Sequence, residues 1–308
     1  MVSENKEYIL GIDIGGTNIR IGMVDRNNTL HNFICEKSNS FIRGEKSLEE
    51  LESYISKYIK LNNMDQLIAI AIGFPATISK DKKLIISSPN IQGFNNINIV
   101  ASLESMFNVP VFIDKDVNFL LEYEIMKRKL IGNKIILGFY IGTGFGNSIY
   151  INGNFLNGKN GVAGELGHIP VLDNLFKCSC GNIGCIETLS SGKRLEELRK
   201  IYFPDTNIRQ VFKNHKHDSI IKSFIQAIAV PIATEINIFD PHYVIIGGGV
   251  VRMMDFPNKL LENYIYKYSR KPFPATNLTI LYAQAGQEMG VLGGAHYARN
   301  RLKTNLKQ

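Results

Sequence analysis

The sequence lacks a long hydrophobic run. We find no uninterrupted apolar stretch near the roughly 20 residues that a membrane-spanning helix needs. The first eight residues, MVSENKEY, contain no apolar segment of the kind that a secretory signal requires. These absences predict a cytoplasmic protein with no membrane partner. The shares of hydrophobic residues (44%) and charged residues (20%) are ordinary for a globular enzyme.

The chain also has no dense block of one charge. Its net charge of +7 and its isoelectric point near 9.1 could indicate nucleic-acid binding. The densest basic clusters, however, are only KRK at 127–129 and KNHK at 213–216. Scattered lysines are typical of solvated faces, so the sequence predicts no nucleic-acid partner.

Cysteine is scarce, and three of the four cysteines lie together. Cys178, Cys180 and Cys185 follow His168, whereas Cys35 stands alone and has no assigned role. Three thiolates and one imidazole suit tetrahedral Zn²⁺, and a site with four protein ligands would be structural. The alternatives are buried free thiols or a disulfide, which would be strained between the neighbours of a Cys-x-Cys pair.

The phosphate-binding pattern GxxxxGK[ST] is absent, but two glycine–threonine turns are present. YILGIDIGGTNIRIG begins at Tyr8 and IILGFYIGTGFGNSIYINGNF begins at Ile135, and each reads as strand, turn and returning strand. Glycine lets backbone amides approach a phosphate closely, and threonine adds a hydroxyl donor. The duplication predicts a polyphosphate clamp, although either turn alone could be a simple hairpin. Gly247–Gly249, after YVII, could hold a nucleoside against the backbone.

Two carboxylates follow the apolar run VPVFI. On a continuing strand Asp114 and Asp116 would share one face, and a carboxylate close to a polyphosphate is a candidate general base. The alternative is that Asp116 or Asn118 caps the following helix.

Apolar spacing predicts the main elements of an α/β protein. Ser47 is the expected N-cap of the first helix. The expected helices cover 46–63, 98–107, 119–130 and 290–302, and the expected strands cover 67–75 and 109–118, besides the two hairpins.

Taken together, the motifs resemble the ROK family of bacterial sugar kinases, in the actin/hexokinase superfamily. They occur in the family's order as DIGGT, GFP, SPN, DKDVN, GTGFG, GVAGELGH, CSCGNIGCIE and IIGGG. The resemblance implies a two-lobed fold of the ribonuclease-H-like type with a cleft between the lobes. The expected small lobe is 1–117 plus about 290–308. The expected large lobe is 118–289 and contains the zinc knuckle, the segment with His168 and the three clustered cysteines.

The resemblance also implies ATP with Mg²⁺ and a hexose as partners, structural Zn²⁺, and a homodimer or dimer of dimers. By position Asp116 is the catalytic base, and His168 would contact zinc through one ring nitrogen and the sugar through the other. The positions that match sugar-binding residues are Asn90, Asn118, Glu165, His168 and Glu187. The positions that match the ATP and magnesium side are Asp13, Gly15, Gly16, Thr17, Thr143, Gly144 and Gly248.

The resemblance leaves the hexose open. Ala76 stands where the family commonly has the last glycine of Gly-x-Pro-Gly, and Lys115 stands where many glucokinases have asparagine. The stretch GFPATISKDKKLIISSPN resembles D-allose kinases, so the expected reaction is phosphorylation of D-allose at its 6-hydroxyl. The alternatives are a glucokinase, an N-acetylmannosamine kinase or a sugar-sensing regulator. Family repressors carry a DNA-binding segment before the first motif, for which Asp13 comes too early.

Overall fold

The computed structural model describes residues 7–38, 44–64, 66–89 and 91–305. The chain divides into two compact units. Unit 1 comprises Met1–Ile131, Asn157–Ala163 and Gly286–Gln308, and unit 2 comprises Gly132–Leu156 and Gly164–Ala285.

The boundary expected after residue 117 lies at residue 131 instead. Helix α3 (Asp116–Arg128) packs along α9 (Met289–Asn305), and this contact keeps α3 in unit 1. The segment 157–163, expected in the large lobe, also belongs to unit 1.

Unit 1 is built on a five-stranded mixed sheet in the order β3-β2-β1-β4-β7. β1 pairs antiparallel with β2 and parallel with β4, which pairs parallel with β7. A small second sheet joins β5 to β6. The strands are β1 (Tyr8–Ile14), β2 (Asn18–Asp25), β3 (Leu30–Lys37), β4 (Leu67–Phe74), β5 (Thr77–Ile78), β6 (Ile85–Ser87) and β7 (Val111–Lys115).

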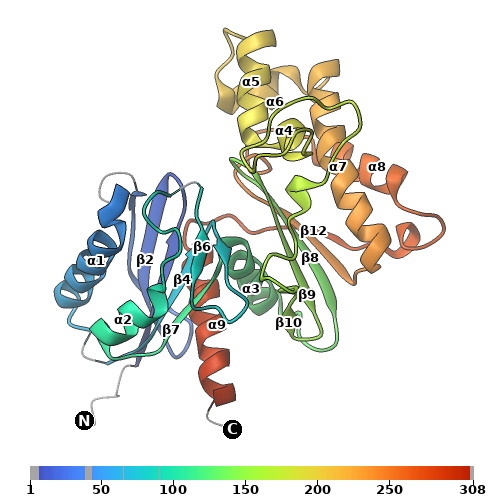
Figure 1. Ribbon diagram of the computed structural model, residues 1–308. Helices are drawn as coiled ribbons and strands as arrows, with labels where there is room; N and C mark the ends of the chain where they lie inside the picture. The colour runs from blue at the N-terminus through green and yellow to red at the C-terminus, as the bar shows by residue number, and fades with distance from the viewer. Residues whose placement is uncertain (1–6, 39–43, 65, 90, 306–308) are drawn as a thin grey trace. The chain divides into compact units, whose positions relative to one another are not determined.

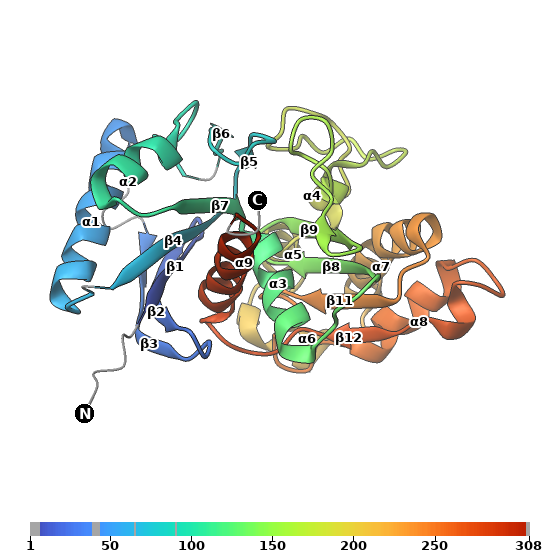
Figure 2. The same cartoon turned by 90° about the horizontal axis from the view of Figure 1, so that it is seen from below.

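Helices cover both faces of the unit 1 sheet (Figures 1 and 2). Helices α1 (Ser47–Leu61) and α2 (Ile99–Phe107) lie on one face, and α9 with α3 lies on the other. The core between the sheet, α1 and α2 is formed by buried aliphatic side chains such as Ile12, Ile55 and Ile72.

Unit 2 repeats the same strand order in its own sheet, β10-β9-β8-β11-β12. Again an antiparallel hairpin is followed by parallel neighbours. The strands are β8 (Ile135–Ile141), β9 (Phe145–Ile151), β10 (Asn154–Phe155), β11 (Tyr243–Gly247) and β12 (Ile280–Tyr282); the helices are α4 (Glu187–Ser190), α5 (Gly192–Tyr202), α6 (Val211–His215), α7 (Ser219–Phe239) and α8 (Asn258–Tyr268). Short 3-10 turns cover 44–46, 166–168, 208–210 and 275–277.

The duplicated hairpin is confirmed by this topology. The hairpins β1–β2 and β8–β9 each turn through three residues. Each hairpin occupies the same place in a five-stranded sheet of the same strand order. The expected α/β fold class is therefore correct.

Two local expectations were wrong. Ser47 does not cap α1; its Oγ donates to the carbonyl groups of Gly44 and Gln92. The strand expected over 109–118 ends at Lys115, and Asp116 is already the first residue of α3.

Helix α7 bears on the expected absence of a membrane-spanning segment. With 21 residues it is long and apolar enough to cross a membrane, by length and composition. However, 56% of its apolar window is buried, and its inward residues, including Ile228 and Ile232, join the core of unit 2. Such burial is typical of a core helix in a globular domain.

Candidate active site

Three parallel strands of unit 1, β1, β4 and β7, end side by side, with β7 at one edge of the sheet. Asp13 on β1 pairs in register with Gly73 on β4, and Gly73 pairs with Asp114 on β7. Gly73 has no side chain to separate its neighbours, and a Cβ there would lie 3.3 Å from the Cα of Asp116. The register thus gathers Asp13, Asp114 and Asp116 at the carboxyl edge of the sheet, where ligands of open α/β sheets bind.

The carboxyl group of Asp116 lies in a buried setting that raises its pKa. It lies in the first turn of α3, where Oδ1 accepts a hydrogen bond of 2.9 Å from the Val117 amide. Burial, followed by the charge of Asp13, raises the pKa of Asp116 to about 7. A carboxylate with such a pKa can accept a hydroxyl proton at neutral pH.

Asp114 lies in a different environment from Asp116, because the chain turns into α3 between them. Asp114 is 1% exposed, and its Oδ1 accepts from Lys82 Nζ at 2.8 Å and from Asn118 Nδ2 at 2.8 Å. Asn118, expected to bind sugar, is itself 2% exposed. This network fixes the start of α3.

Asp13 is held between a cation and a helix N-terminus. Arg20, its register partner on β2, donates from Nη1 to Asp13 Oδ2 at 3.0 Å and from Nε to Gln287 Oε1 at 2.8 Å. A Cβ at Gly290, in the first turn of α9, would lie 2.7 Å from the Asp13 carboxyl carbon. Burial outweighs Arg20 and raises the pKa of Asp13. A divalent cation bound here would offset that cost.

The first glycine–threonine turn leaves amides available. The Gly15 amide closes the turn by donating to the Asn18 carbonyl at 2.8 Å. Within the described part of the chain, the amides of Gly16 and Thr17 donate no hydrogen bond, and both residues are exposed. Such a turn can donate to phosphate oxygens.

The second turn, in unit 2, contacts two other elements. The Phe145 amide donates to Glu187 Oε2 at 2.8 Å, and a Cβ at Gly144 would lie 2.4 Å from the same oxygen. The Gly192 amide, at the N-terminus of α5, donates to the Gly142 carbonyl at 2.8 Å. The positive end of α5 thus lies beside this turn, which favours an anion.

Gly248 lies in the third backbone element that was expected on the nucleotide side. Its φ is +98°, and a Cβ would lie 2.3 Å from the carbonyl oxygen of Ile141. Glycine is therefore required for the turn after β11 to pack on the end of β8. Val250 completes the junction by donating to Ile141 at 2.9 Å.

The cluster expected to bind zinc is assembled in unit 2. Ligand atoms of His168, Cys178, Cys180 and Cys185 lie within 4.8 Å of one another. His168 Nδ1 is 3.5 Å from Cys178 Sγ, and Cys180 Sγ is 3.6 Å from Cys185 Sγ. These separations fit the edges of a tetrahedron with metal–ligand bonds of about 2.0–2.3 Å.

The donor chemistry of the cluster also fits zinc. Burial, followed by hydrogen bonds from the neighbouring thiols, raises the pKa of Cys185 to about 12. A bound cation would stabilise the thiolate form. Because Nδ1 of His168 faces the thiols, Nε2 is left on the other side, 3.7 Å from Glu165 Oε2.

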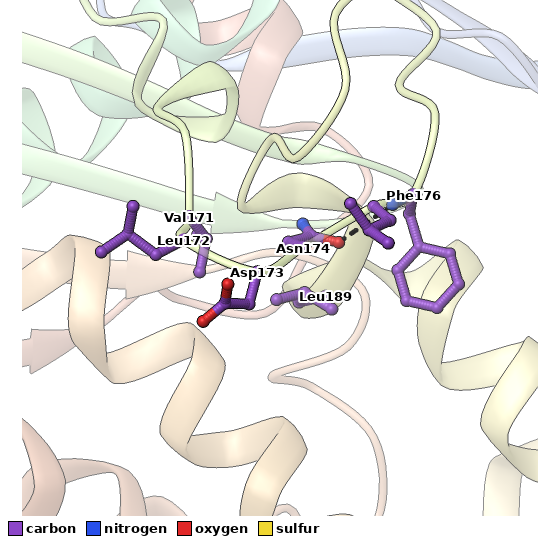
Figure 3. Close-up of a pocket in the computed structure, with 7 residues that line it drawn as sticks. Val171, Leu172, Asp173, Asn174, Phe176 and Leu189 are labelled. Atoms are coloured by element: carbon purple, nitrogen blue, oxygen red, sulfur yellow. Dashed lines mark hydrogen bonds between the residues drawn. The ribbon is translucent and has the colours of Figure 1, made fainter.

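A separate pocket lies in the knuckle segment of unit 2 (Figure 3). Its lining is mostly apolar, with Asp173 and Asn174 as the polar members, and it contains none of the expected site residues. Asn174 shapes it by accepting from the Phe176 amide at 3.2 Å. The lining residues are Val171, Leu172, Asp173, Asn174, Leu175, Phe176 and Leu189.

The expected site residues thus fall into two groups, each described within its own unit. Asn90 lies outside the described residues. Sequence reasoning missed Arg20, Lys82, Gly192 and Gln287; the only local signal was the place of Arg20 opposite Asp13 across the hairpin. The unit 1 group is Asp13, Gly15, Gly16, Thr17, Asp116 and Asn118, and the unit 2 group is Thr143, Gly144, Glu165, His168, Cys178, Cys180, Cys185, Glu187 and Gly248.

Comparison with known proteins identifies the class to which this fold and these motifs belong. The model of the ROK family matches residues 9–301, so the chain belongs to the ROK family. A ROK hexokinase structure from Thermus thermophilus superposes with a TM-score of 0.77 at 25% identity, covering 96% of this chain and 99% of that one. The fold is therefore the two-lobed, hexokinase-like α/β fold.

Relatives at similar identity carry different names. A glucokinase from Thermotoga maritima is 25% identical over 96% of this chain and 99% of its own length. An N-acetyl-D-glucosamine kinase from Yersinia enterocolitica is 26% identical over 92% of this chain and 97% of its own length. A putative xylose repressor from Caldicellulosiruptor sp. is 28% identical over 86% of this chain and 72% of its own length. None of these relatives is named a D-allose kinase, so the comparisons do not favour that substrate.

Proposed function

We propose that this protein is an ATP-dependent hexose kinase that transfers the γ-phosphoryl group of ATP to the 6-hydroxyl of its sugar. The chain is a ROK-family sugar kinase in class, as its relatives and motifs indicate. The observation that carries the proposal is the pair Asp13 and Asp116 beside an open glycine–threonine turn. A base with a pKa near neutrality next to a phosphate-binding turn is what hydroxyl phosphorylation needs.

In this proposal Asp116 accepts the proton of the attacking hydroxyl. Asp13, with a raised pKa and Arg20 at 3.0 Å, is suited to hold Mg²⁺ close to the transferred group. When bound, the metal would neutralise charge on the phosphates. The turns at Gly16–Thr17 and Thr143–Gly144, with the N-terminus of α5, would donate to phosphate oxygens.

The sugar side of the proposal involves unit 2. His168 would contact the sugar through Nε2 while zinc holds Nδ1, so the metal orients the imidazole and takes no part in the reaction. Glu187, anchored by the Phe145 amide, would accept from a sugar hydroxyl, and Glu165 beside His168 would do the same. Asn90 and Asn118 keep their proposed sugar-binding roles on resemblance alone.

The particular hexose is a finer proposal. D-allose rests on the resemblance of residues 73–90, whereas the named relatives favour D-glucose or N-acetyl-D-glucosamine. D-allose and D-glucose differ only at carbon 3, so a few polar contacts must decide between them. One unpaired buried polar group costs about 1–3 kcal/mol, which corresponds to roughly one to two orders of magnitude in kcat/KM.

A coupled ADP-release assay tests both levels. The sugars are tested one at a time, and a reaction without sugar is the blank. The panel is D-allose, D-glucose, D-mannose, D-fructose, N-acetylmannosamine and N-acetyl-D-glucosamine. Turnover of at least one sugar is expected, and its absence in zinc-loaded protein with MgATP would overturn the kinase proposal. If another sugar exceeds D-allose about tenfold in kcat/KM, a difference of about 1.4 kcal/mol, the D-allose proposal fails while the kinase proposal stands.

Regulation of transcription is the alternative, because the family includes a putative repressor. The buried carboxylates at the strand edge favour the enzyme, since a regulator needs no base with a pKa near 7. A gel shift at physiological salt should show no specific DNA complex. Cytoplasmic location and assembly as a dimer or dimer of dimers remain part of the proposal.

A further inference from the structure

The hairpin β5–β6 of unit 1 has a tip whose shape is fixed by its own hydrogen bonds. The Lys82 amide donates to the Ser79 carbonyl at 2.9 Å, and the Ser79 amide donates to the Leu84 carbonyl at 2.9 Å. Lys82 has a φ of +58°, in the left-handed region that few non-glycine residues adopt. The tip thus presents the Lys82 side chain in a defined direction.

Lys82 points into the interior of unit 1 and pairs with a buried carboxylate. Its Nζ lies 2.8 Å from Asp114 Oδ1, and the two side chains are 15% and 1% exposed. The same oxygen accepts from the Lys115 amide at 2.7 Å and from Asn118 Nδ2. Oδ2 makes no hydrogen bond with any residue that the structure describes. Removing Lys82 would therefore leave a poorly compensated buried charge.

The other side of the hairpin is held by segment 157–163. A Cβ at Gly161 would lie 2.3 Å from the Ile78 carbonyl oxygen, so the segment lies directly against β5. Lys115 Nζ donates to the Ala163 carbonyl at 2.7 Å. The hairpin is therefore fixed between this segment and the end of β7, which leads directly to Asp116.

We propose that Lys82 is a positioning residue that sets hexose selectivity. It acts through Asp114: the ion pair holds the hairpin against the segment that carries Asp116 and Asn118. The inference rests on the proposed hexose kinase function and adds to it a residue that does not touch the reacting atoms. The hairpin lies in the stretch 73–90, where the sequence departs from the family pattern at Ala76.

The test compares Lys82→Met with Lys83→Met, an exposed lysine on the same tip. Misplacement of reacting groups by about 1 Å can cost about 10²-fold, so Lys82→Met should lower kcat/KM for the hexose by about 10–100-fold. The KM for ATP should stay within about twofold of the unchanged protein, because the phosphate-binding turns are untouched. Selectivity between the best sugar and its best-accepted epimer should fall at least about threefold. Lys83→Met should change none of these, and Lys82→Arg should restore most of the loss.

Hydrogen exchange gives a readout that needs no activity. The Lys115 amide, which donates to Asp114, should exchange at least about tenfold faster in Lys82→Met and unchanged in Lys83→Met. Unchanged exchange, or unchanged selectivity in a folded Lys82→Met, overturns the inference. If Lys82→Met does not fold, Lys82→Gln takes its place under the same criteria. If the unchanged protein turns over no sugar, the proposed kinase function is wrong. That outcome can be distinguished from a failure of the proposal for Lys82, which needs an active unchanged protein.

Discussion

The carboxyl group of Asp116 acquires its chemistry from position. Burial at the strand edge is the largest cause of its raised pKa, and Asp13 is the second. Neither cause is a property of aspartate itself, since an exposed aspartate has a pKa near 3.9. Asp114 is a poorer candidate for the base than Asp116, because its Oδ1 already accepts hydrogen bonds from Lys82 and Asn118.

The pH dependence of catalysis should follow Asp116. A base must be deprotonated to accept the hydroxyl proton, so kcat/KM for the hexose should rise as pH increases through about 7 and level off above it. Below that pH it should fall about tenfold per pH unit. Initial rates at saturating MgATP from about pH 5.5 to 8.5 measure this. A flat profile would argue against Asp116 as the base.

Asp116→Asn should abolish most turnover while it leaves hexose binding largely intact and raises stability at high pH. Turnover should fall by about 10²–10⁴-fold, while hexose affinity by calorimetry stays within about tenfold. In the folded state Asp116 keeps its proton up to a pH of about 7, whereas in the unfolded state it keeps it only up to about 3.9. The free energy of unfolding therefore falls as the pH rises between those two values. The variant should therefore be more stable than the unchanged protein at pH 8, by at least about 1 kcal/mol.

Asp205→Asn, an exposed carboxylate in unit 2, is the matched control and should match the unchanged protein in both measurements. Loss of sugar binding together with turnover would indicate that Asp116 has a structural role.

Among the elements, the zinc knuckle is built mostly from contacts between residues that are close in the sequence. Its three thiols lie within a stretch that turns back through Gly181 and Gly184, both with positive φ. Pairing of Pro170 with Cys185 brings the segment after His168 back beside the last thiol. The knuckle thus joins His168 to the segment that leads into Glu187.

Removing a metal ligand should therefore damage stability and sugar binding together. Elemental analysis should find about one zinc per chain, and Cys180→Ala should lose most of it. Its KM for the hexose should rise about 10–100-fold, because loss of the metal leaves His168 without the partner that orients its ring. Cys35→Ser, on β3 of unit 1, should keep both zinc and activity. Full activity in a verified zinc-free sample would contradict the structural role.

At the scale of the whole molecule, the chain consists of two α/β units with separate cores. The core of unit 1 is built around β1 and β4, and the core of unit 2 around β8, β11 and α7. Each unit is large enough to unfold on its own. Two-state unfolding is therefore not expected.

Calorimetry should resolve two unfolding transitions. Zinc chelation should lower only the transition of unit 2, because all four ligands lie in that unit. Leu10→Ala, in the core of unit 1, should lower the other transition and cost about 2–5 kcal/mol. Since the chain has no tryptophan, heat capacity or circular dichroism should replace intrinsic tryptophan fluorescence. A single transition that both changes shift equally would contradict independent units.

Local patterns in the sequence predicted much of this protein. Alternating apolar residues around a glycine–threonine turn specify a hairpin through contacts between near neighbours, and the repeat of that pattern predicted the duplicated sheet. The knuckle was predictable for the same reason, since its cysteines are separated by only one and four residues. Errors at Ser47 and at the end of β7 arose where a distant backbone carbonyl or the start of a helix changed the local geometry.

The tertiary structure alone decided which distant residues meet. Asp13 lies by Asp116, Lys82 by Asp114, Arg20 by Gln287 and Gly144 by Glu187. The order of strands and their register create these neighbours, and both are set by burial of the whole sheet. A local pattern carries no information about register between distant strands. The hairpins and the knuckle therefore follow from the sequence, whereas the charges around Asp116 follow from the packed sheet.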